Sequence, residues 1–80
     1  MKEIYVDLQN PNQIQNFVKT LTTLDGEFEL ISGKYILDAR SLMGIFSLDL
    51  SKPILLKIYD PTEKTLDALK PYIAKLKGEQ

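Results

Sequence analysis

The 80-residue sequence contains no cysteine, no histidine and no tryptophan. Without cysteine the chain has no disulfide scaffold, no thiolate zinc site and no cysteine nucleophile. Without histidine it has no Ser-His or Cys-His catalytic pair, no imidazole metal ligand and no phosphohistidine chemistry. These absences exclude most classes of enzyme, and we predict a protein that is not an enzyme and that uses no cofactor and no metal.

The chain also lacks an excess of charge of either sign and any long apolar run. Its 10 basic and 11 acidic side chains give a net charge of −1 and a pI near 5.3, which argues against a nucleic-acid partner. Acidic residues interrupt the start of the chain, and no apolar run approaches the roughly 20 residues of a membrane span. We therefore expect one soluble cytoplasmic domain over residues 1–80, because so short a chain forms one small core.

Local signals predict short elements in the order β-α-β-β-α-β-α. Alternating apolar residues predict strands over residues 2–8, 27–32, 34–38 and 54–59. Apolar residues at helical spacing predict helices over residues 11–24, over residues 42–48 and from residue 61 onward. Two layers bury all these apolar faces, so we predict an α+β fold with a four-stranded, largely antiparallel sheet and three helices on one face. Tyr5, Glu29 and Lys57 are then expected on the other, open face of the sheet.

A capping residue followed by proline precedes two of the predicted helices. Asn10 before Pro11 and Asp60 before Pro61 suit the N-cap and the first helical position. Gln13, three residues after Asn10, fits a capping box. These signals predict that the two helices begin at the prolines.

The last helix is interrupted by Pro71, which we expect to kink or divide it because proline removes one helical hydrogen bond and crowds the preceding turn. Its predicted buried stripe consists of Leu66, Leu69, Ile73 and Leu76.

The stretch from Gln9 to Asn16 holds six amide side chains in eight residues. Free N–H groups at a helix start, together with amide donors, could bind an anion or small ligand. Helix capping and a polar outer face also explain the stretch, and no lysine, arginine or glycine-rich loop makes it specific for phosphate. Acidic pairs such as Glu27 with Glu29 are typical of a solvated strand face.

The short predicted helix over residues 42–48 is apolar on more than one face. Ile45 and Leu48 can share the core face, which leaves Leu42, Met43 and Phe46 on other faces. A compact exposed patch that contains Met and Phe is typical of a docking surface. Alternatively, the loop after Leu48 folds over the patch.

Ser41 precedes this apolar patch and suits the N-cap of the short helix. Capping by its hydroxyl contributes typically ~1 kcal/mol to stability. A phosphate on the same hydroxyl would carry roughly −1.5 to −2 charge at the positive end of the helix, next to Arg40. Capping alone and capping with phosphorylation are both compatible with the residues.

Residues 39–48 closely resemble the regulatory-serine segment of HPr, the small phosphocarrier of the bacterial sugar phosphotransferase system. The family pattern is a basic residue, Ser, an aliphatic residue, Met-Gly, an aliphatic residue, a Met-like residue, Ser or Thr, and Leu. Phe46 replaces the usual methionine. The matching residues are Arg40, Ser41, Leu42, Met43, Gly44, Ile45, Ser47 and Leu48. The order of elements also resembles the HPr fold, an open-faced sandwich, over nearly the whole chain.

The resemblance fails at the residue that carries the phosphoryl group in HPr. By ungapped counting, the position of the family's active histidine falls on Asn10 and that of its arginine falls on Asn12. An amide is no phosphoryl acceptor, and no guanidinium lies nearby in sequence to balance the charge. The resemblance therefore implies an HPr-like protein without phosphohistidine carrier activity.

What the resemblance leaves is a regulatory role through Ser41. In HPr-like regulatory proteins that lack the active histidine, the corresponding serine is phosphorylated by HPr kinase, and the phosphoprotein binds a transcription regulator. By this resemblance Ser41 is the modified residue, and Arg40, Leu42, Met43 and Phe46 bind the partner. Two alternatives stay open, namely a constitutive protein-interaction module and anion or small-ligand binding at the Gln9 to Asn16 helix start.

Overall fold

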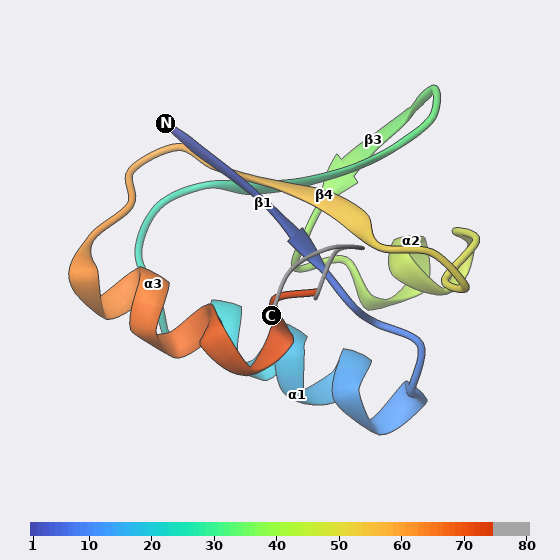
Figure 1. Cartoon of the computed structure of the whole chain (residues 1–80), viewed down its shortest axis with the longest axis horizontal. Helices are drawn as coiled ribbons and strands as arrows, with labels where there is room; N and C mark the ends of the chain where they lie inside the picture. Colours follow the sequence, from blue (N-terminus) through green and yellow to red (C-terminus); the bar gives the residue numbers. More distant parts are fainter. Residues whose placement is uncertain (75–80) are drawn as a thin grey trace.

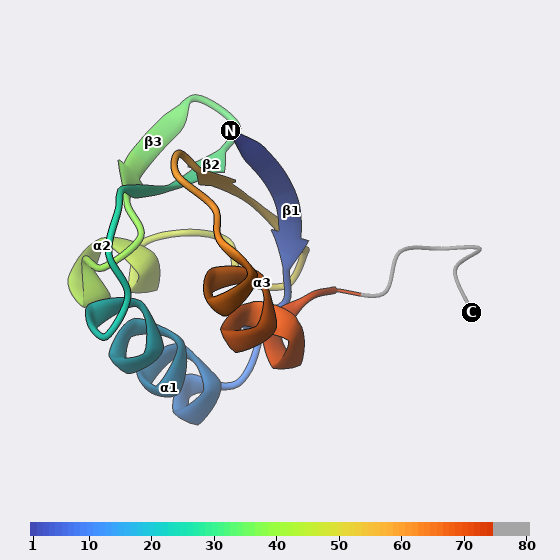
Figure 2. The ribbon, with the colours of Figure 1, turned by 90° about the vertical axis from the view of Figure 1, so that its left-hand side faces the viewer.

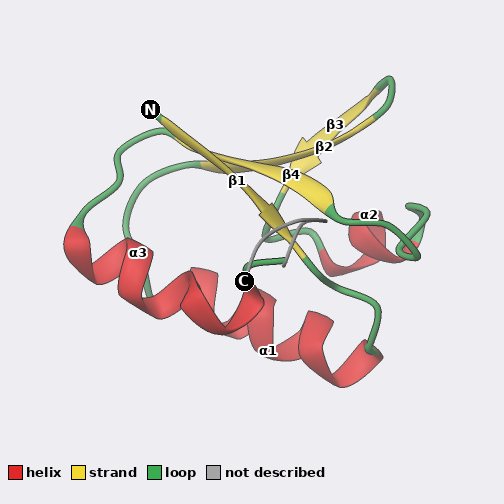
Figure 3. Cartoon of the chain, viewed as in Figure 1, coloured by secondary structure: helices red, strands yellow, loops and turns green. Residues whose placement is uncertain are grey.

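The computed structural model describes residues 1–74 and contains four strands and three α-helices. Figure 1 traces them along the chain, and Figure 3 separates helices from strands by colour. In chain order they are β1 (Lys2–Val6), α1 (Pro11–Thr22), β2 (Phe28–Ser32), β3 (Tyr35–Asp38), α2 (Leu42–Phe46), β4 (Ile54–Ile58) and α3 (Glu63–Leu69), followed by the 3₁₀ turn η1 (Lys70–Tyr72).

The strands form one antiparallel sheet in the order β1-β4-β2-β3. The helices lie together on one side of this sheet and leave its other side open (Figure 2). The predicted α+β architecture, with an antiparallel sheet and three helices on one face, is confirmed. Tyr5 on the open face is exposed, and Glu29 and Lys57 beside it are partly exposed.

The core lies between the sheet and the helices. Ile14, Phe17 and Leu21 face inward from α1 at helical spacing and are essentially inaccessible to solvent. Alternate residues of the central strands, including Leu30 and Leu56, meet them from the sheet. Burial of these apolar side chains is the main source of stability for so small a domain.

The predicted N-caps of α1 and α2 are confirmed, and the predicted N-cap of α3 is wrong. The Asn12 N–H donates to Asn10 Oδ1 over 2.8 Å at the start of α1, so Asn10 is its N-cap. At α3 the N-cap is Thr62, whose hydroxyl accepts from the Thr65 N–H over 3.2 Å, and not Asp60. The helix therefore begins after Pro61, because a threonine two residues on offers a second cap.

Pro71 divides the C-terminal segment, as predicted. Because Pro71 has no N–H, α3 ends at Leu69 and the chain continues as the 3₁₀ turn η1. The predicted burial of Ile73 is wrong, because Ile73 has extended backbone beyond the turn, pairs with Val6 in an isolated bridge and is exposed. Tyr72 takes its place in the core and meets the Phe17 ring edge to face, with centroids 5.4 Å apart. Leu76 lies outside the described residues.

Glycines with positive φ occupy two turns of the chain. Gly26, with φ of 104°, turns the chain from α1 toward β2, and Gly33, with φ of 59°, begins the two-residue turn between β2 and β3. Both conformations are disfavoured for residues with a side chain. The helix ends at Thr22, two residues before its predicted end, so Gly26 turns the chain after the helix and does not cap it. The predicted turn at Ser32-Gly33 is confirmed.

A matched pair of phenylalanines tests where the core lies. We expect Phe17→Ala to destabilise the domain by about 3–5 kcal/mol, because it removes a fully buried ring. Phe46→Ala should cost less than about 1.5 kcal/mol, since that ring is half exposed. Urea unfolding followed by circular dichroism measures both, and Phe17→Leu serves if Phe17→Ala does not fold. Equal losses for the two Ala variants would contradict this placement of the core.

Candidate functional site around Ser41

Ser41 stands in a tight connection between β3 and α2. The Ser41 N–H donates to the Asp38 carbonyl over 2.9 Å, and the Arg40 N–H donates to Asp38 Oδ1 over 2.8 Å. The Ser41 hydroxyl then accepts from the Gly44 N–H over 3.2 Å. This hydrogen bond confirms the predicted position of Ser41 as the N-cap of α2, and the residue is exposed to solvent.

Gly44 leaves the space that this cap needs. A Cβ atom at position 44 would lie 2.9 Å from Ser41 Oγ and 3.4 Å from Leu37 Cδ1. Any side chain would therefore press on the capping hydroxyl or on the side chain beneath it. The close approach of Gly44 to Ser41 therefore explains the glycine that follows Met43.

The apolar patch consists of Leu42, Met43 and Phe46, and it is open to solvent. Their side chains are 38%, 85% and 48% exposed, whereas Ile45 on the opposite side of α2 is fully buried. Leu48 packs against the core, as expected. The loop after Leu48 therefore leaves the apolar patch uncovered, although its predicted use in docking stays a prediction.

Arg40 has a role that the sequence did not reveal. Its guanidinium donates from Nε to the Leu21 carbonyl over 3.1 Å, from Nη2 to the Leu24 carbonyl over 2.8 Å and from Nη1 to the Gly26 carbonyl over 3.1 Å. It also lies 4.9 Å from the centroid of the Phe28 ring. The cation thus lies at the negative end of the α1 dipole, where it adds a hydrogen bond to the Leu21 carbonyl, which also accepts from the Leu24 N–H. Its other two bonds go to carbonyls in the turn that follows the helix.

These bonds change the interpretation of Arg40 as a residue that binds a partner. Three of its N–H groups are occupied within the fold, and the side chain is partly buried. The contacts favour a positioning role, in which Arg40 fixes the connection that carries Ser41. Its direct contribution to partner binding stays a prediction.

The amide-rich helix start forms a shallow hollow of about 340 Å³ at the other candidate site. It is lined by Asn10, Asn12, Gln13, Asn16, Pro71 and Tyr72. The Asn10 side-chain oxygen already accepts from the Asn12 N–H, and no basic side chain lines the hollow. This geometry matches capping and adds nothing that is specific for an anion.

Asp49, just beyond α2, accepts hydrogen bonds from the hydroxyl and the backbone N–H of Ser51, and these bonds lower the pKa of its carboxyl. Among residues 1–74, no cluster of acidic side chains could hold a metal ion. No helix in the same part of the chain is long and apolar enough to cross a membrane.

The geometry defines an open-faced α+β sandwich with a solvent-exposed capping serine beside an apolar patch. Comparison with solved structures identifies the fold more closely. The chain is similar to HPr-C-His from Thermoanaerobacter tengcongensis, with a TM-score of 0.72, 25% sequence identity and coverage of 91% of each chain. The chain therefore has an HPr-like fold. No family model matches the chain, and no curated protein matches it.

Removal of the Arg40 guanidinium tests its positioning role. We expect Arg40→Ala to destabilise the domain by about 2–3 kcal/mol, because buried carbonyls at the end of α1 lose charge-assisted hydrogen bonds. Lys70→Ala is the matched control, since its ion pair with Asp67 is exposed and such pairs contribute less than about 1 kcal/mol. Urea unfolding gives both values. Equal losses would show that Arg40 does not hold this end of α1.

Proposed function

We propose that this chain is an HPr-like protein without phosphohistidine carrier activity, which acts through protein contacts around Ser41. The observation that carries the proposal is an exposed serine at the N-cap of α2, directly beside an exposed apolar patch. The HPr-like fold supports the proposal, because the segment that carries these residues resembles the regulatory-serine segment of HPr.

The absence of a phosphoryl acceptor supports the loss of carrier activity. The chain contains no histidine, and Asn10 stands where the family pattern has its active histidine. The Asn10 side-chain oxygen is engaged as the cap of α1. An amide in this position stabilises the helix start but does not accept a phosphoryl group as a histidine does.

Phosphorylation of Ser41 fits the local geometry. The hydroxyl oxygen would attack the terminal phosphoryl group of ATP, the bond to ADP would break, and a base of the kinase would take the hydroxyl proton. The product would place its charge beside the N–H groups at the start of α2, where negative charge is favourable. The Arg40 guanidinium would stay with the carbonyls of α1, so the charge would be met by these N–H groups and by the partner.

The apolar patch would provide the rest of the docking surface. Met43 is almost fully exposed, and Phe46 lies one helical turn further along α2. Flexible methionine and aromatic side chains supply much of the binding energy at protein interfaces. HPr kinase and a transcription regulator are the partners that the resemblance implies.

A constitutive interaction module is the second candidate, and the exposure of Met43 favours it as much as it favours a regulated one. Anion or small-ligand binding at the Gln9 to Asn16 helix start is less favoured, because no basic side chain lines that hollow. A regulated and a constitutive docking surface differ in their dependence on Ser41.

Intact-mass measurement tests the modification. We expect the purified protein to gain one phosphoryl group with ATP and HPr kinase, and none with phosphoenolpyruvate and enzyme I. Ser41→Ala should abolish the gain, whereas Ser47→Ala, which changes another exposed serine at the end of α2, should retain it. No gain in the native protein, or a gain in Ser41→Ala, would contradict phosphorylation at Ser41.

Charge placed in the apolar patch tests docking separately. We expect Met43→Asp or Phe46→Asp to raise the KM for phosphorylation by HPr kinase by about tenfold or more, as loss of a central apolar contact does. Tyr35→Asp is the control, because Tyr35 lies in β3 and its exposure, 68%, falls between those of Met43 and Phe46. The same KM for all three variants would show that the kinase does not dock on this patch. Capture of a partner that persists in Ser41→Ala but is lost in Met43→Asp would instead favour the constitutive module.

A further inference from the structure

The open face of the sheet carries a row of apolar side chains that crosses all four strands. The register pairs Tyr5 with Leu55, Leu55 with Ile31, and Ile31 with Ile36, so one residue of each strand lies in the same row. Tyr5 is 44% exposed and Ile36 is 63% exposed. We call these four residues the open-face row.

The core does not require this row. The helices cover the opposite face, to which the neighbouring residues Val6, Leu30 and Leu56 point and where they are buried. An antiparallel sheet covered on one side normally alternates apolar and polar residues, with the polar ones in water. Four apolar residues that are aligned on the solvent side therefore indicate a surface that something covers.

Acidic side chains border the open-face row on one side. The next row consists of Glu3, Lys57, Glu29 and Asp38, which are paired across the strands in that order. Three carboxylates and one ammonium group leave this side negative. The Tyr59 hydroxyl donates a hydrogen bond to Glu29, and this bond raises the pKa of the tyrosine.

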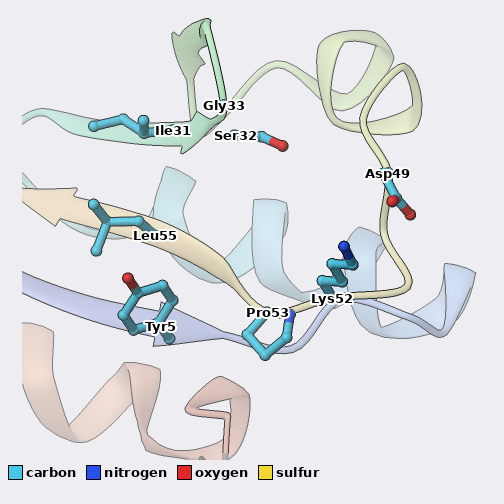
Figure 4. Close-up of a pocket in the computed structure, with 8 residues that line it drawn as sticks. All are labelled: Tyr5, Ile31, Ser32, Gly33, Asp49, Lys52, Pro53 and Leu55. Atoms are coloured by element: carbon cyan, nitrogen blue, oxygen red, sulfur yellow. The ribbon is translucent and has the colours of Figure 1, made fainter.

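Lysines border the row on its other side. A shallow hollow of about 470 Å³ lies here, and Figure 4 shows Tyr5, Ile31 and Leu55 along it, with Lys52 and Asp49 from the loop before β4. Lys34 stands in the hairpin turn two residues before Ile36. Asp49 and Asp7, which lies two residues beyond Tyr5, offset these two ammonium groups. This side is therefore close to neutral, whereas on the acidic side three carboxylates outnumber one ammonium group.

We propose that the open face binds a second copy of this chain across a twofold axis that runs along the open-face row. Rotation about this axis lays the apolar row of one copy on that of the other. It also places the acidic side of each copy over the Lys34 and Lys52 side of its partner. A twofold axis along the strands would instead place acidic side on acidic side, which costs free energy.

The size of the face sets the strength of the dimer. Four strands about 4.8 Å apart, three with five residues and one with four, at a rise of about 3.4 Å per residue, give a face of roughly 19 by 17 Å. Such a face is smaller than the roughly 800 Å² per partner of a standard interface, so we expect a weak, concentration-dependent dimer. Sheets that pack in this way lie about 10 Å apart with strands at about 30°. The helices lie on the other side of each sheet, so the dimer leaves the apolar patch on α2 free and does not depend on the function proposed for Ser41.

Sedimentation equilibrium from micromolar to millimolar concentration at low salt tests this dimer. We expect a monomer–dimer equilibrium in the native protein that Ile36→Lys abolishes and that Lys34→Glu weakens at least several-fold. Met43→Lys is the matched control, because it places the same charge on an exposed apolar residue of α2 and should leave the equilibrium unchanged. A native protein that stays monomeric throughout, or a dimer lost in Met43→Lys, would overturn the proposal.

The absence of cysteine allows the direction of the axis to be tested. With a short bis-maleimide, Ile36→Cys should cross-link to itself and Tyr5→Cys to itself, because residues on the axis meet their own counterparts. A mixture of the two variants should yield few mixed cross-links, since Ile36 and the partner's Tyr5 would lie three strand spacings, about 14 Å, apart. Mixed cross-links in excess would overturn the proposed axis.

Discussion

The hydrogen bonds of the Arg40 guanidinium connect the end of α1 with the segment between β3 and α2. The cation meets carbonyls of Leu21, Leu24 and Gly26, where α1 ends and the chain turns toward β2. Helix ends that are not capped in some way leave carbonyls without a partner, which is costly in a partly buried position. Because Arg40 directly precedes Ser41, the same contacts that cap α1 also hold the connection from β3 to α2. The position of the candidate site thus depends on an interaction outside it.

The contacts that stabilise α2 also leave Ser41 and the apolar patch accessible to solvent. The Ser41 hydroxyl caps α2 and remains exposed, because the helix is only five residues long and Ile45 alone anchors it fully in the core. Gly44 comes so close to that hydroxyl that a side chain would displace it. A short helix that is tied at its start, with one buried residue, necessarily presents its other apolar side chains to solvent. The exposure of Met43 therefore follows from the geometry of α2.

Much of the fold follows from signals that are local in sequence. The caps at Asn10 and Ser41, the proline in the C-terminal segment and the alternation in the strands each depend on residues a few positions apart. The predictions from local signals were wrong in two places. Two possible caps precede α3, and Thr62 rather than Asp60 is the one used. At Ile73 the backbone is extended and no longer helical, so the helical spacing that predicted its burial does not apply. The contacts of Arg40 with α1 span 14 to 19 residues, so no pattern around Arg40 indicates them. The open-face row depends on the register of four strands, which only the folded sheet establishes.

The exposed apolar side chains of this domain lie on two separate surfaces, the open-face row and the apolar patch on α2. One layer of helices can cover only one face of a sheet, so the apolar residues of the other face gain nothing from folding alone. Their exposure costs solubility unless another molecule covers them. The open-face row and the apolar patch on α2 belong to opposite layers, and they differ in their surroundings. Acidic and basic groups flank the row on its two sides, which suits a self-complementary contact, whereas the patch on α2 has a single modifiable hydroxyl at its edge. The two surfaces are therefore suited to different partners, and occupation of one does not exclude occupation of the other.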